Sequence, residues 1–201
     1  MKNSTPFKKD FFKLSLIAVA LIGASCDSPK AEDTKEVALE HNEAKFDSSN
    51  NQKDAKFLVN VAEINLEEIK LGQLAKEMGR TEHVKELGQM MDTAHTKCMN
   101  SLVSLANAKS ITIPTTPTDN ALKAYKDLNN KSGADFDLAY CDMMVSGHKD
   151  AIVMFEKAST ESTDADIKQW AAETLPELRM HLDHAMSCQK ECEKIKATAS
   201  K

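Results

Sequence analysis

The sequence predicts an all-α protein that folds as a four-helix bundle. Four long stretches carry apolar residues at the three- and four-residue spacing of an amphipathic helix. The chain of 201 residues has only six glycines and five prolines, which suits an all-helical fold. Tight turns join neighbouring stretches, and one long connection separates the second stretch from the third, as in a bundle with a crossover. The tight turns disfavour the competing fold, an extended coiled coil.

The first and second predicted helices span residues 55–79 and 82–108. At about 100° per residue, their apolar side chains fall on one stripe of each helix. Gly79 is the expected residue just past the end of the first helix, and Thr81 is the expected N-cap of the second. The two helices are therefore expected to form a hairpin.

A long connection, residues 109–131, follows the second helix and contains a short helical piece at 120–128. The third long helix spans residues 135–158 and the fourth spans residues 165–196, and each again carries one apolar stripe. Together the four long helices define a bundle domain over residues 55–198.

The N-terminal residues 1–25 have the features of a lipoprotein signal peptide. Their start is rich in lysine, and their apolar run of nine residues (LSLIAVALI) is far shorter than a membrane span of about 20 residues. Small residues then lead to Cys26, the expected site of lipidation, although Gly23 stands where such a motif usually has leucine. Cleavage beside an unmodified Cys26 is the alternative. Residues 26–54 are charged and poor in large apolar side chains, which predicts a disordered polar tether.

Charge and export define the expected surroundings of the protein. The net charge is −5 and the exported part has no basic run, so nucleic acid is not an expected partner. The expected partner is a membrane, through the lipid on Cys26. The expected location is the cell envelope, at the outer membrane or facing the periplasm. The sequence identifies no protein partner.

Each long helix places one polar side chain on the face expected to be buried: Glu68, His95, His148 and His181. Counted from the turns at about 1.5 Å per residue, the four lie at similar heights near the middle of the bundle. A buried polar group without a partner costs about 1–3 kcal/mol, so these side chains need partners. Three imidazoles and one carboxylate suit a transition metal such as zinc, iron or copper. The alternative is a hydrogen-bonded network that fixes helix register without metal.

Besides Cys26, the chain has four cysteines, and an exported protein lives where disulfides persist. In an antiparallel helix hairpin, residues at one level have residue numbers with a constant sum. That sum is the same for Cys141 with Cys188 as for His148 with His181. The sequence therefore predicts a disulfide between Cys141 and Cys188 near one end of the bundle. The alternative is that the thiols are small buried core residues.

Five segments resemble those of a known family: INLEEIKLGQLA, MMDTAHTK, ITIPTTPTD, SGADFDLAYCDMMVSGHKDAIVMFEKA and LPELRMHLDHA. They resemble the ferritin-like, exported bacterial family called domain of unknown function 4142, over roughly residues 55–185. The four polar residues named above match that family's polar positions. Ala94 departs from the pattern, because an aspartate usually precedes this histidine. The resemblance implies a ferritin-like bundle in a protein often described as an outer-membrane protein, and it implies no activity.

No catalytic motif is recognisable, since the sequence shows neither an activated nucleophile nor a phosphate-binding loop. Three classes of function stay open: a metal-binding or metal-storing envelope lipoprotein, a metal-free structural or protein-interaction module of the envelope, and a small redox or stress-protective enzyme. A ferroxidase centre needs a Glu-x-x-His motif on two helices. Here Leu178 lies three residues before His181, and Asp92 lies three residues before His95.

Overall fold

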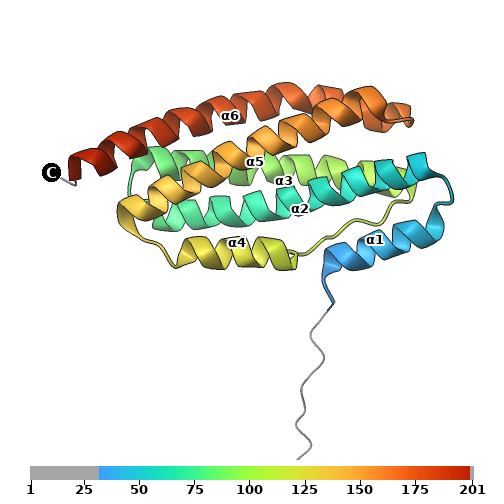
Figure 1. Ribbon diagram of the computed structural model, residues 1–201, viewed down its shortest axis with the longest axis horizontal. Coiled ribbons are helices and arrows are strands. Elements are labelled where there is room, and N and C mark those ends of the chain that lie inside the picture. The colour runs from blue at the N-terminus through green and yellow to red at the C-terminus, as the bar shows by residue number, and fades with distance from the viewer. Residues whose placement is uncertain (1–31, 200–201) are drawn as a thin grey trace, which may run out of the picture. The chain divides into compact units, whose positions relative to one another are not determined.

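The structure, a computed structural model, describes residues 32–199. This part of the chain contains six α-helices and no β-strand (Figure 1), so the prediction of an all-α protein is confirmed. The helices are α1 (Thr34–Lys45), α2 (Ser49–Met78), α3 (Glu82–Lys109), α4 (Asp119–Asn129), α5 (Gly133–Glu161) and α6 (Ala165–Ala199). The predicted long helices correspond to α2, α3, α5 and α6, and the predicted short helix corresponds to α4.

Side-chain caps fix where several of these helices begin. The hydroxyl of Ser48 accepts a hydrogen bond from the Asn51 N–H at 3.1 Å at the start of α2. Thr81 caps α3 in the same way, as predicted. Thr118 caps α4 directly after the long connection. Each cap satisfies a backbone N–H that has no partner within its own helix.

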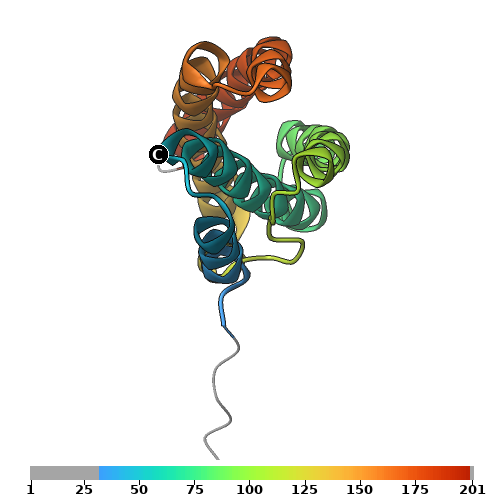
Figure 2. The same ribbon diagram turned by 90° about the vertical axis from the view of Figure 1, so that its right-hand side faces the viewer.

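The long helices pair as two hairpins. α2 packs along α3, α5 packs along α6, and α2 also contacts α5 (Figures 1 and 2). α4 and α1 lie against α2 on its other side. Among the described residues, no helix is long and apolar enough to cross a lipid bilayer.

The apolar core has two parts, separated along every long helix by a polar position. One cluster contains Leu58, Val61, Leu102, Phe155 and Ile167, among others. The other contains Leu71, Met91, Phe136, Tyr140 and Met144, among others. The sequence positions between the two clusters hold the buried Asn65 and Glu68 on α2, His95 on α3, His148 on α5 and His181 on α6. The polar layer is thus flanked by apolar packing at both ends.

The backbones of α2 and α3 approach closely at two facing glycines. A Cβ atom at Gly72 would lie 2.7 Å from the carbonyl oxygen of Gly88 and 2.9 Å from the backbone nitrogen of Asp92. A Cβ atom at Gly88 would lie 2.7 Å from the carbonyl oxygen of Gly72. Only glycine fits at this crossing, and the crossing sets the spacing of the first hairpin.

The predicted disordered tether differs from what the structure describes. Within residues 26–54, α1 forms over Thr34–Lys45 and α2 begins at Ser49. The Asn42 side chain, 3 % exposed, donates to the Thr112 carbonyl at 2.8 Å and accepts from the Thr112 N–H at 2.9 Å. Specific polar contacts with the long connection therefore order a segment whose composition alone indicates disorder. The predicted signal peptide and Cys26 lie outside the described residues.

Candidate metal centre

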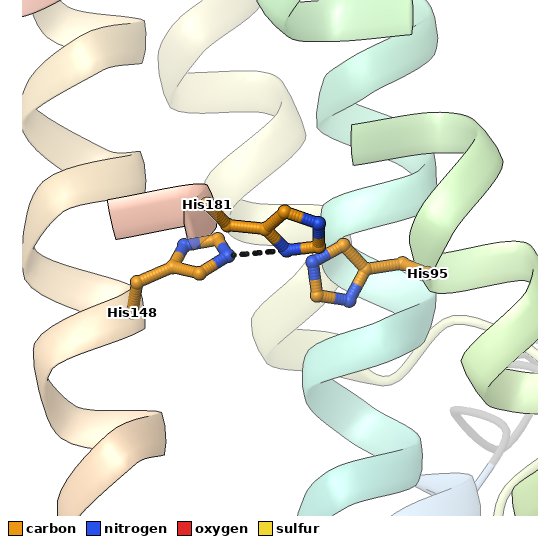
Figure 3. Close-up of side chains that lie close together, drawn as sticks. All are labelled: His95, His148 and His181. Carbon is orange, nitrogen blue, oxygen red and sulfur yellow. Dashed lines mark hydrogen bonds between the residues drawn. The ribbon is translucent and has the colours of Figure 1, made fainter. Parts of the chain in front are cut away.

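Three histidines from three helices meet in the polar layer. His95 on α3, His148 on α5 and His181 on α6 are 3 %, 1 % and 2 % exposed. One ring nitrogen of each lies within 4.8 Å of one ring nitrogen of the others. Figure 3 shows the three rings turned toward one another, with the His148–His181 hydrogen bond drawn between them. This is the arrangement that the sequence predicts for the three imidazoles.

Hydrogen bonds at the outer ring nitrogens fix the tautomers of two histidines. Nδ1 of His95 lies 2.8 Å from Oδ1 of Asn65, and Nδ1 of His148 lies 2.9 Å from the Met144 carbonyl oxygen. Because both oxygens can only accept, each Nδ1 carries the proton. The Nε2 lone pairs of His95 and His148 are then free to accept. An outer N–H held by an oxygen is the usual arrangement of a histidine that ligates a metal.

His181 completes the trio from the opposite side. Its Nδ1 lies 3.4 Å from Nε2 of His148. Because that Nε2 carries a lone pair and no proton, the Nδ1–H of His181 is the donor. Nε2 of His181 and Nε2 of His95 are buried and have no hydrogen-bond partner in the described chain. Two buried lone pairs without partners are costly for a closed network. They fit a site that receives a cation.

Glu68 lies beside this trio rather than inside it. Its Oε1 atom is 3.8 Å from Nδ1 of His148, the nitrogen that already donates to Met144. The group of mutually close ligand atoms contains the three histidines and not Glu68. The Oε2 atom of Glu68 is buried and has no hydrogen-bond partner among the described residues. The sequence therefore places Glu68 at the right level, but its carboxylate adjoins only one of the imidazoles.

One family model matches the chain over a range that contains the whole polar layer. The chain belongs to the family described as Domain of unknown function (DUF4142). That family's model matches residues 39–188, which confirms the resemblance seen in the sequence. No curated protein and no solved structure matches the chain. Membership in DUF4142 thus brings no assigned activity.

Burial keeps the titratable groups of this DUF4142 layer neutral. Burial, with smaller effects from His148 and His181, holds the pKa of His95 well below its usual value. Burial lowers the pKa of His148 to about 4 and, with a smaller effect from His184, lowers the pKa of His181 to about 4. Burial, followed by the nearby Glu67, raises the pKa of Glu68 well above its usual value. At neutral pH the imidazoles therefore present lone pairs for which no proton competes.

The layer has a small internal space and a route to solvent. A cavity of about 20 Å³ is bordered by His95, His181, Ala94 and Glu177. Roughly 10–15 Å³ is enough for one water molecule, so a single water fits beside His95 and His181. Ala94, Glu177 and His181 also line an open groove of about 790 Å³ on the surface. The small Ala94 side chain lies at this passage.

Outside the histidines, the sequence predicts a disulfide between two cysteines, and the structure brings these two residues together. Cys141 and Cys188 face each other with their Sγ atoms 3.1 Å apart, but both are free thiols, so their disulfide stays a prediction. Sequence reasoning assigned no role to Asn65, which orients His95, or to Cys192, whose Sγ lies 3.9 Å from that of Cys141. The signal for Asn65 was available, because it is an amide on the apolar face of its helix.

Proposed function

We propose that the protein is a metal-binding lipoprotein of the cell envelope, built on a ferritin-like four-helix bundle. The order of two hairpins, α2–α3 and α5–α6, with a long connection between them supports the ferritin-like bundle. One observation carries the metal site: three neutral imidazoles converge, and two of them have their outer N–H held by an oxygen. Such an arrangement orients the ligands, and a bound ion would replace the hydrogen bond between His181 and His148.

The donor set favours zinc, iron or copper. Imidazole nitrogen suits all three metals, and His148, His95 and His181 supply three such donors. Glu68 lies beside the outer nitrogen of His148, so its carboxyl group neighbours that ligand and is not itself among the close ligand atoms. When bound, the ion would supply Lewis-acid or redox chemistry according to its identity. The residues of the chain hold and orient the ligands and exclude bulk water from the site.

The surroundings of Asp92 favour one ion over a di-iron centre. Asp92 lies three residues before His95, where a di-iron bundle places a glutamate ligand. Its carboxylate pairs with Lys76 at 3.0 Å and accepts from Gln73 at 3.1 Å. Since Asp92 is committed to surface partners on α2, the layer offers ligands for a single ion.

Metal content tests the site directly. The protein purified from its native host is expected to contain about one transition-metal ion per chain bound by histidine, and His148→Ala is expected to lose that ion. Because the ion binds only the folded state, removing it with a chelator should lower the melting temperature. At a free metal concentration of 100 times Kd, binding stabilises the folded state by about 2.7 kcal/mol. His184→Ala, at an exposed position on α6, is the matched control and should retain the metal.

A metal-free result would favour the alternative of a hydrogen-bonded structural layer. In that case the wild-type protein contains no stoichiometric metal, and a chelator leaves its melting curve unchanged. The bonds from His95 to Asn65 and from His181 to His148 would then serve only to fix helix register.

Anchoring is a separate part of the proposal, supported by the sequence before residue 32. If Cys26 carries lipid, Cys26→Ser should move most of the protein from the membrane fraction to the soluble envelope fraction. Fractionation followed by immunoblotting measures this change, and Cys98→Ser serves as the cysteine control. Failure of the wild-type protein to incorporate labelled palmitate would contradict the anchor without affecting the metal site.

A further inference from the structure

A second cluster of potential metal ligands lies in the core, apart from the histidines. Cys141 on α5 and Cys188 and Cys192 on α6 are all buried, at 0 %, 6 % and 3 % exposed. Cys141 comes one heptad before His148, and Cys188 comes one heptad after His181. The thiols therefore lie about 10 Å along the helices from the imidazoles, at the 1.5 Å rise per residue of an α-helix. They form a site of their own.

The spacing of the three sulfur atoms fits one shared ion. The Sγ atoms of Cys141 and Cys188 are 3.1 Å apart, and those of Cys141 and Cys192 are 3.9 Å apart. All three Sγ atoms lie within 4.8 Å of one another. Three sulfurs around one ion in a plane, with metal–sulfur distances of about 2.3 Å, would be about 4 Å apart. Small side-chain adjustments reach that arrangement, because the backbone already holds the three thiols together.

The donors around the cluster favour an ion that accepts three soft ligands. Thiolate sulfur selects monovalent copper or zinc, and a structural zinc site takes four ligands. The nearby acid Asp137, one helical turn before Cys141, is unavailable as a fourth ligand. Its two oxygens accept hydrogen bonds from the backbone N–H groups of Arg80 and Thr81 at 2.8 and 3.0 Å. No histidine or carboxylate joins the three thiols in the described part of the chain.

We propose that Cys141, Cys188 and Cys192 form a second metal site, which takes one monovalent copper ion on three sulfur ligands. As the ion binds, the thiols that become ligands release their protons to solvent, and no change of oxidation state is needed. A disulfide between Cys141 and Cys188 would use two of the same sulfurs. The bond and the copper ion therefore exclude each other, and bound copper protects the thiols from oxidation.

A surface pocket gives the ion a route to the cluster. This pocket, of about 280 Å³, is lined by Cys188 together with His83, His184 and Met90. Imidazole and thioether groups both bind copper, so the walls can pass the ion to Cys188. The pocket is separate from the groove that leads to His181, apart from Glu86 and Met90, which line both. The two sites can thus be loaded independently.

Competition with a copper chelator tests the site. The full chain, reduced and kept anaerobic, is loaded with monovalent copper and titrated with bicinchoninate. One copper ion per chain is expected to resist the chelator, with only sulfur ligands by X-ray absorption. Loss of a partner outside the ligand shell costs about 10–100-fold in affinity, so loss of the ligand in Cys192→Ser should cost more than about 100-fold.

Matched variants distinguish this site from the histidine site. Cys98→Ser removes a cysteine outside the cluster and should keep full copper affinity. His148→Ala should also keep it, whatever the fate of the metal in the histidine layer. Cys192→Ala repeats the test with an apolar side chain in case serine disturbs the core, and circular dichroism confirms that each variant is folded.

Three results would overturn the proposal. The first is unchanged copper affinity in both folded variants of Cys192. The second is loss of copper from His148→Ala but not from Cys192→Ser, which would place the ion on the imidazoles. The third is a Cys141–Cys188 disulfide that persists in the folded chain under reductant, seen as two missing thiols.

Discussion

Replacing Gly72 with valine is expected to remove a large part of the stability of the protein. Even the first carbon of a side chain would meet the backbone of α3 at 2.7 and 2.9 Å, and backbone atoms cannot rotate away. Overpacking of this kind typically costs about 1–3 kcal/mol. Gly72→Ala should lose that amount, and the larger, branched valine should lose more. Against a total stability of about 5–15 kcal/mol, this loss is large.

Urea unfolding followed by circular dichroism measures the effect as a lower transition midpoint. Gly147→Ala is the matched control, because it also lies inside a long helix. A Cβ atom there would meet only Oε1 of the Glu68 side chain, at 3.3 Å. This control should change the free energy of unfolding by no more than about 1 kcal/mol, since alanine is also the better helix former. Equal stability of Gly72→Ala and Gly147→Ala would contradict the close crossing of α2 and α3.

Metal-free protein is expected to lose stability steeply as the pH falls from about 6.5 to about 4. His148 and His181 have folded-state pKa values of about 4, below the ordinary value of 6.5. In this window the unfolded chain binds more protons than the folded chain, so acid favours unfolding. At about 1.4 kcal/mol per pKa unit, each histidine accounts for about 3 kcal/mol once both states are protonated. Glu68 acts in the opposite direction, because its raised pKa keeps it protonated in the folded state at pH values where the same carboxyl group is ionised in the unfolded chain.

The measurement is the urea midpoint at several pH values with a chelator present. His148→Asn should lessen the fall in stability between pH 6.5 and 4, because one of the groups that must be protonated is gone while His181 remains. His41→Asn, at an exposed position on α1, should keep the wild-type pH profile. A wild-type profile that is flat over this range would show that the imidazoles are not held neutral by burial.

The helices and the histidine layer could be predicted because their signals are local. Apolar spacing fixes where each long helix lies, and a polar residue on an apolar stripe is visible without any partner. His95, His148 and His181 meet as the sequence indicates. Glu68 also lies at that level, but which ring it touches depends on side-chain directions across two helices. The sequence alone does not determine those directions.

The features that could not be predicted depend on contacts between distant residues. α1 is ordered by the pairing of Asn42 with Thr112, 70 residues away, and no local pattern indicates it. The role of Asn65 depends on His95 standing opposite on another helix. Cys192 joins Cys141 because the next turn of α6 still faces α5, whereas spacing alone favours Cys188.

Helix α1 also determines where a pulling force on the N-terminal side would enter the domain. Its polar contacts run to the long connection and to α2: Asn42 holds Thr112 by two hydrogen bonds, Asp33 accepts from the Asp119 N–H at 2.6 Å, and Lys35 pairs with Glu63. Tension on the chain before residue 32 therefore loads these few polar contacts first. They can yield while the two hairpins and the histidines between them keep their geometry. In a tethered protein, α1 would therefore detach first under tension, and the core would keep its structure when the anchor moves.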